Sequence, residues 1–223
     1  QNIKELYTMN TTKDSIKRIF NGIVDEDYFS AADFHIHTKA SDGKLSAKEV
    51  VEQARAKGLK HFAICDHNTF DAYKEIDYQN IPELVTGIEF DCWYRGIFLH
   101  LLGYGIDINS EFLKPFLAKN KAETEKDIIR IFANRNVPKL IEAIHNAGGI
   151  AILAHSACCW TINHEHFVKC MIKIGLDGLE TRYPYKRHRG IIKFHRAKNI
   201  KKIAEKLNLI QTGGTDAHRD LIS

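Results

Sequence analysis

The chain has 223 residues, 44% of them hydrophobic and 27% charged, which is an ordinary balance for a soluble globular domain. No apolar run approaches the roughly 20 residues needed to span a bilayer, so the sequence predicts no membrane association. The net charge of +4 suits an anionic substrate but falls short of the basic surface typical of nucleic-acid-binding proteins.

The five cysteines are odd in number and form no C-x-x-C pair, so they indicate neither a disulfide framework nor a zinc-thiolate site. The first residues also lack the basic-then-apolar pattern of a signal peptide. The expected location is therefore the cytoplasm.

The first half of the chain predicts alternating strands and helices. Residues 1–30 are expected to form an N-terminal extension packed on one domain that spans residues 31–223. A helix begins at the capping box of Ser46 and Glu49 and stops at Gly58. In chain order, the expected elements are a strand at 32–36, this helix, strands at 61–65 and 84–88, and a hairpin at 92–102 that turns at 95–96.

The second half continues the alternation after a charged insertion. Residues from about 110 to 137 are rich in Lys and Glu and predict a small helical insertion that caps a pocket. Beyond it, the expected elements are a helix at 138–147, a strand at 150–154, a helix at 163–174, a strand at 177–179, a basic helix at about 189–207 and a strand at 209–212. This order predicts an α/β fold.

Polar side chains follow most of these short apolar strands. His35 and His37 are one residue apart where the first strand ends, so both imidazoles point to the same face and can hold one cation. Similar residues stand at or near the other strand ends, namely Asp66, His67, Glu89, His100, His155, Glu180, Asp216 and His218. In a barrel of parallel strands the carboxyl ends form the catalytic face. The sequence therefore predicts a metallohydrolase with a polynuclear site.

Together these motifs resemble those of the PHP (polymerase and histidinol phosphatase) family, over about residues 31–220. The motifs are His35-Ile36-His37-Thr38, Asp42-Gly43, Cys65-Asp66-His67-Asn68, Gly87-Ile88-Glu89, Leu153-Ala154-His155 and Gly214-Thr215-Asp216-Ala217-His218. The segment that begins at His100 is similar to the branch of nucleoside bisphosphate phosphatases and exoribonucleases. The resemblance implies a distorted (β/α)7 barrel of the PHP type with a small helical insertion.

The resemblance also implies nine metal ligands in three sets, assigned by matching position. The sets are His35, His37, Glu89 and Asp216; Glu89, His100 and His155; and Asp42, His67 and His218. Imidazole and carboxylate ligands suit two to three divalent Zn, Mn or Fe ions. Simpler explanations remain for two members, because Asp42 precedes a glycine and could form a turn, and His100 could be a residue of the hairpin ladder.

The reaction that the resemblance implies is hydrolysis of a phosphomonoester by a metal-bound hydroxide at a di- or trinuclear site. The substrate is expected to be a small phosphorylated metabolite or a nucleotide, with a short oligonucleotide as a further option. Arg182 and His188 lie in a basic, aromatic segment after Glu180, and we expect them to bind phosphate and to assist the leaving oxygen. A solvated basic loop is an equally open interpretation of this segment.

Three other functions compete with this one. A non-catalytic, metal-stabilised module that docks on a partner would not need nine ligand positions. A nuclease acting on oligonucleotides would be expected to show a longer basic groove. An amidohydrolase-like enzyme that cleaves C–N bonds typically needs a metal-bridging lysine, and none stands among the motifs.

Overall fold

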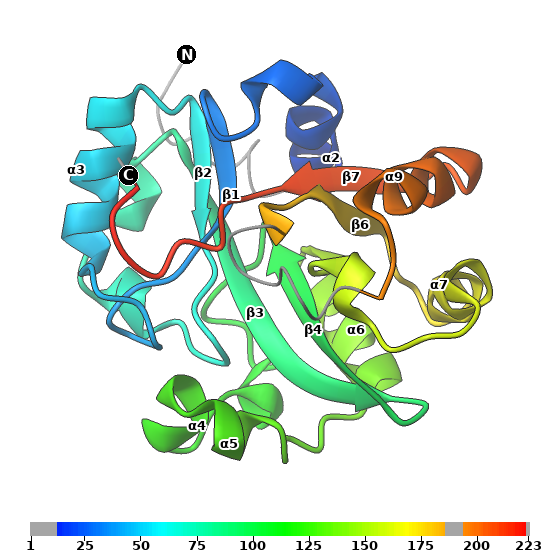
Figure 1. Ribbon diagram of the computed structural model, residues 1–223. Coiled ribbons are helices and arrows are strands. Elements are labelled where there is room, and N and C mark those ends of the chain that lie inside the picture. Colours follow the sequence, from blue (N-terminus) through cyan, green and yellow to red (C-terminus); the bar gives the residue numbers. More distant parts are fainter. Residues whose placement is uncertain (1–12, 186–193, 222–223) are drawn as a thin grey trace.

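The computed structural model describes residues 13–185 and 194–221, and its strands form one mixed sheet (Figure 1). The strands are β1 (Ala32–Ile36), β2 (His61–Ile64), β3 (Leu84–Tyr94), β4 (Ile97–Tyr104), β5 (Ile150–Leu153), β6 (Gly178–Arg182) and β7 (Ile210–Gly213). They lie side by side in chain order, and all pairings are parallel except those of β4 with β3 and β5.

The two edges of the sheet meet beyond the ends of β1 and β7. Ile36 forms a parallel bridge with Ala217, and the backbone N–H of His37 donates to the Ala217 carbonyl at 2.9 Å. Apart from this bridge, no ladder of paired residues joins β1 to β7 among the described residues. The sheet is thus curled into a distorted barrel, which confirms the predicted fold class.

Helices surround this sheet (Figure 1). They are α2 (Lys13–Gly22), α3 (Ala47–Lys57), α4 (Ala122–Glu125), α5 (Asp127–Arg130), α6 (Val137–Asn146), α7 (His164–Ile172) and α9 (Ala197–Lys206). Short 3₁₀ helices lie at Asp25–Asp27, Asp71–Lys74, Tyr78–Asn80, Lys114–Phe116 and Ser156–Cys158. None of the helices in the described ranges combines the length and apolar character that crossing a bilayer requires.

Local sequence signals explain where α3 begins and ends and where the hairpin turns. The Ser46 hydroxyl accepts the backbone N–H of Glu49, whose carboxylate accepts the backbone N–H of Ser46, so α3 begins at the predicted capping box. Gly58 ends α3 in the left-handed conformation, with φ 77°. Arg95 and Gly96 also have positive φ values, 52° and 76°, as a two-residue hairpin loop requires. The predicted turn at these positions is confirmed.

Two predicted elements differ in the structure. The strand at 84–88 and the first arm of the hairpin are one continuous strand, β3, because its residues stay paired with β4 from Gly87 to Tyr94. The connection from β3 to β4 is the tight turn at Arg95 and Gly96. The described part of the predicted basic helix begins at Ala197, because Phe194 and His195 donate their backbone N–H groups to the Ala157 carbonyl. Residues 189–193 of that prediction lie outside the described residues.

Alternating strand residues build two apolar clusters. Phe62 and Ile64 of β2 belong to a cluster that includes residues of the outer helices, whereas Ala63 and Cys65 belong to a second cluster with strand residues and α2. Phe20 of α2 packs edge-on against Phe34 and Tyr104, with ring centroids 4.7 and 5.1 Å apart. Helix α2 therefore covers one end of the sheet, and α4 and α5 lie at the opposite end (Figure 1).

Closure of the sheet depends on a glycine. A Cβ atom at Gly214 would lie 2.3 Å from the His35 Cβ and 2.4 Å from the His35 backbone nitrogen. No real Cβ contact is that short, so Gly214→Ala must push the segment after β7 away from β1. We expect a loss of about 1–3 kcal/mol in unfolding free energy, which corresponds to roughly 2–4 °C in Tm per kcal/mol.

Thermal unfolding followed by circular dichroism measures this effect. Gly22→Ala is the matched control, because a Cβ there meets nothing within 4 Å. Equal Tm values for the two variants would contradict the close-approach argument.

Candidate metal centre

His35 and His37 lie where β1 ends, and both are fully buried. Their Nε2 atoms lie 3.2 and 3.3 Å from Glu89 Oε2. The same two atoms lie 3.6 and 3.1 Å from Asp216 Oδ1. The structure therefore brings the first predicted set together, with donor atoms of all four residues within 4.8 Å of one another.

The second oxygen of Glu89 faces a different pair of imidazoles. Glu89 Oε1 lies 3.0 Å from His100 Nδ1 and 3.2 Å from His155 Nε2. These two nitrogens are 3.1 Å apart. The second predicted set is thus assembled around one oxygen of Glu89 and the first around the other, which is the arrangement of a carboxylate that bridges two cations.

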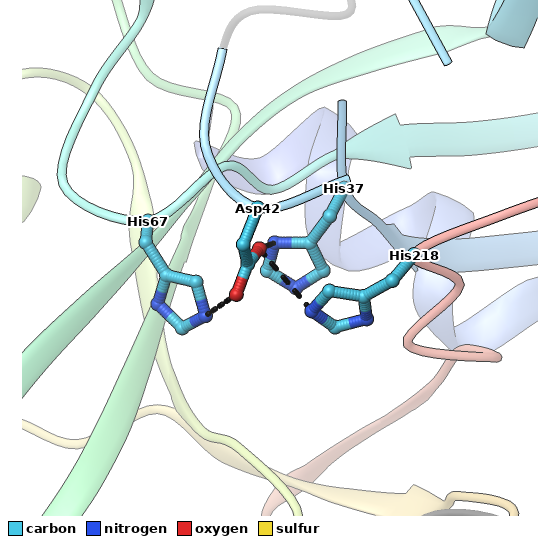
Figure 2. Close-up of side chains that lie close together, drawn as sticks. All are labelled: His37, Asp42, His67 and His218. Carbon is cyan, nitrogen blue, oxygen red and sulfur yellow. Dashed lines mark ion pairs between the residues drawn. The ribbon is translucent and has the colours of Figure 1, made fainter. Parts of the chain in front are cut away.

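A third group surrounds Asp42 (Figure 2). Asp42 Oδ1 lies 3.2 Å from His218 Nε2 and 3.5 Å from His37 Nδ1. Asp42 Oδ2 lies 3.7 Å from His67 Nε2, on the other side of the carboxylate (Figure 2). The donor atoms of these four residues also lie within 4.8 Å of one another. The structure thus gathers the third predicted set and adds His37 to it.

Hydrogen bonds from a surrounding layer orient these side chains. Glu180 accepts a hydrogen bond from His35 Nδ1 at 2.9 Å and another from the backbone N–H of His155 at 2.6 Å. With its Nδ1 proton held in this way, a neutral His35 would present the Nε2 lone pair to a bound cation. The hydroxyl of Tyr183 donates to Asp216 Oδ2 at 2.6 Å.

Asp66 also belongs to this layer. Its carboxylate accepts hydrogen bonds from the backbone N–H of Thr38 at 2.7 Å, and from the hydroxyls of Thr38 and Ser41 at 2.6 Å each. It therefore holds the loop that follows β1. Asp66 thus supports this loop through hydrogen bonds and is not one of the nine assigned ligand positions.

Asp91 is a further site residue that the sequence interpretation missed. It is completely buried, its Oδ2 lies 3.3 Å from His67 Nδ1, and its Oδ1 lies 3.1 Å from His100 Nε2. The opposite nitrogens of both imidazoles then face the centre. The Glu-x-Asp spacing of Glu89 and Asp91 on β3 was the available signal, because residues i and i+2 of a strand share one face.

Arg130 is the second missed residue. This side chain of α5 is 5% exposed, and its Nη1 donates to Asp42 Oδ2 at 2.8 Å. Its Nε lies 3.5 Å from Asp91 Oδ1 and has no hydrogen-bond partner among the described residues. No local pattern in the charged insertion distinguishes Arg130 from its basic neighbours, so only the tertiary structure reveals it.

Arg182 lies away from the cluster, contrary to its predicted place in the site. Its guanidinium forms an ion pair with Asp25, donates to Gln211 Oε1 at 2.6 Å and lies 5.2 Å from the Tyr28 ring centroid. The physical reason is the register irregularity between Glu180 and Arg182, which breaks the strand alternation that would place both on one face. His188 lies outside the described residues.

The electrostatics of the cluster show a close balance of opposite charges. Burial alone would raise the pKa of Glu89, but the charges of His35, His100 and His67 hold it well below its usual range. Burial would likewise lower the pKa of His37, yet contacts with Asp216, Glu89 and Asp42 raise it to about 10. Several buried carboxylates thus stay ionised and need positive charge beside them.

Metal ions fit this need. The Nε2 atoms of His35 and His37 are buried beside carboxylates but make no hydrogen bond within the described residues. Burial and the charge of His100 lower the pKa of His155, which keeps this imidazole neutral, as a metal ligand must be. Mixed imidazole and carboxylate donors are the ligands that Zn, Mn and Fe accept. The residues therefore fit divalent cations.

Comparisons with known proteins agree with the motifs. The sequence profile of the PHP domain matches residues 33–207. A 5'-3' exoribonuclease from Haemophilus influenzae is 28% identical over 146 residues, which cover 64% of this chain and 51% of that protein. A 3',5'-nucleoside bisphosphate phosphatase from Chromobacterium violaceum is 28% identical over 152 residues, which cover 64% of this chain and 50% of that protein. The chain spans about half the length of these curated relatives.

Similarity to a solved structure supports the same fold. The crystal structure of a protein from Bifidobacterium adolescentis, assigned as a metal-dependent phosphoesterase, superimposes with a TM-score of 0.65. The two sequences are 21% identical, and the superposition covers 85% of this chain and 88% of the other. The PHP profile covers most of the 223 residues, including seven of the nine predicted ligand positions. The other two, Asp216 and His218, lie beyond its end. The chain belongs to the PHP domain family.

Proposed function

We propose that this PHP domain is a metal-dependent phosphoesterase that hydrolyses phosphomonoesters of a small metabolite or nucleotide. The observation that carries the proposal is Glu89, a buried carboxylate whose two oxygens face separate groups of histidines. We assign two to three Zn, Mn or Fe ions to the nine ligand positions. When bound, such ions supply an activated water and positive charge for the oxygens of a phosphoryl group.

The shape of the site favours a small substrate. The cavity above the ligands has a volume of about 500 Å³, within the range of small-molecule sites. Its walls include Arg130, whose guanidinium donates to Asp42 and to the Thr124 carbonyl and adds positive charge for a phosphoryl group at the cavity wall. Tyr183 also lines the cavity and holds Asp216 in place through its hydroxyl. In this assignment Arg130 takes the phosphate-binding role first expected of Arg182.

The relatives support phosphate-ester chemistry and also supply the second candidate function. The Chromobacterium violaceum relative is named as a nucleotide phosphatase, whereas the Haemophilus influenzae relative is named as an exoribonuclease. A nuclease that removes nucleotides from short oligonucleotides is therefore the alternative. The cavity of about 500 Å³ fits one small phosphate ester better than a polymer.

A substrate panel tests the proposal directly. We expect the protein, loaded with Mn or Zn, to release phosphate from histidinol phosphate, nucleoside monophosphates or nucleoside 3',5'-bisphosphates, because each is a small phosphomonoester of the proposed class. Released phosphate and oligonucleotide length are measured in parallel. Cleavage of internal linkages in long single strands, without turnover of any small monoester, would overturn the proposal in favour of a nuclease.

Replacing Glu89 with Gln should lower metal content and turnover more than replacing Asp42 with Asn. Each change removes one negative charge at nearly constant shape, but Glu89 lies beside two ligand sets and Asp42 beside one. Elemental analysis after gel filtration measures bound metal, and phosphate release measures turnover. Asp71→Asn, at an exposed position outside the cluster, is the control and should match the wild type. Wild-type metal content in both site variants would refute the ligand assignment.

Replacing Arg130 with Ala should weaken phosphate binding while leaving the metal ligands in place. Loss of a charge-assisted hydrogen bond costs about 1.5–3 kcal/mol, or roughly a ten- to hundredfold rise in KM and in the inhibition constant of inorganic phosphate. Arg130→Lys keeps the charge without the planar fork, so it should recover part of the loss.

Steady-state kinetics and metal analysis together identify the cause of any defect. Arg55→Ala removes an exposed arginine that pairs with Glu83, and it should change neither the KM nor the metal content. If Arg130→Ala lost metal but kept its KM and its phosphate inhibition, the residue would be a support for Asp42 instead of a phosphate ligand.

A further inference from the structure

A second cavity, of about 480 Å³, adjoins the metal cavity. Its aromatic walls come from Trp93, Phe98 and Trp160. Both cavities are lined by Phe98, His100, Ile131 and His155, so they share one wall that carries two of the predicted metal ligands. We call this second cavity the aromatic annex. A molecule bound to the metals can extend into it directly.

The annex has the chemistry of a site for an uncharged, flat group. The described residues that line it include no lysine, arginine, aspartate or glutamate. Trp160 is 71% exposed and Trp93 is 40% exposed, which leaves large apolar rings facing water. Trp93 already donates its indole N–H to the Ile131 carbonyl at 2.6 Å, so its ring offers a stacking face and no free polar atom.

We propose that the aromatic annex binds the nucleobase of a nucleoside phosphate whose phosphate lies in the metal cavity. This inference rests on the proposed function and narrows it from small phosphate esters to nucleotides. Stacking on aromatic side chains tolerates any base, because every base has a π-face. A second phosphate would find no lysine or arginine among the described residues of the annex, and an alkyl chain would not use the flat walls.

Tryptophan fluorescence can test the annex without any catalysis. The chain has two tryptophans, and both line the annex. In the Mn- or Zn-loaded protein, adenosine should quench this fluorescence in a saturable way, although it carries no phosphate. Ribose 5-phosphate, which has the phosphate but no base, should leave the fluorescence almost unchanged. Saturable quenching by ribose 5-phosphate, with none by adenosine, would overturn the assignment.

Variants connect binding to substrate choice. Trp160→Ala should lower kcat/KM for adenosine monophosphates roughly ten- to hundredfold, mainly through KM, because stacking of one base is lost. It should leave kcat/KM for ribose 5-phosphate unchanged. Phe112→Ala is the control, since Phe112 is 56% exposed and lies outside both cavities. An equal loss for both substrates in Trp160→Ala would contradict base recognition.

The two proposals can fail separately. Quenching by adenosine without turnover of any phosphomonoester would retain the annex and reject the phosphoesterase assignment. Turnover of ribose 5-phosphate and adenosine monophosphates at equal efficiency, without quenching by adenosine, would retain the phosphoesterase and reject the annex. Hexyl phosphate turned over better than adenosine monophosphates would identify the annex as a site for alkyl chains and would also reject base recognition.

Discussion

The burial of the Glu89 carboxylate is the constraint on which the rest of the site depends. An ionised carboxylate removed from water is costly unless opposite charge surrounds it. Glu89 is 1% exposed, and its oxygens lie beside imidazoles from β1, β4 and the segments after β2 and β5. That positive charge can come from protons on the histidines or from divalent cations. Protons and metal ions therefore compete for the same nitrogens.

The fold brings these groups together through close backbone contacts. The loop of Asp42 can lie against the end of β1 only because Gly43 has no side chain, since a Cβ there would be 2.5 Å from the His37 carbonyl oxygen. Gly214 allows the same approach from the segment that carries Asp216. Asp42 and Asp216, which are far apart from each other in the chain, thus both reach His37, and Asp216 also reaches His35. The contacts that close the sheet also bring these ligand positions together.

The charged insertion links the metal cavity to the annex. Arg130 of α5 extends between Asp42 and Asp91, and the next residue, Ile131, lines both cavities and accepts the hydrogen bond of Trp93. A short segment therefore contributes a cation to one cavity and an apolar wall to the other. A ligand with a phosphate at one end and a flat apolar ring at the other matches this pair of surfaces.

Local patterns in the sequence were sufficient to predict the α/β fold, the capping box of α3, the hairpin turn at Arg95 and the strand ends that carry the histidines, whereas the barrel was predicted from the family resemblance. These features depend on neighbours a few residues apart, so the pattern of the chain encodes them directly. Arg182 and Arg130 show where that information ends. A strand irregularity turns Arg182 toward Asp25, and tertiary folding carries Arg130 across 88 residues of sequence to Asp42. Contacts of this kind are decided only when distant segments pack, because no local pattern specifies which of many similar charged side chains becomes buried.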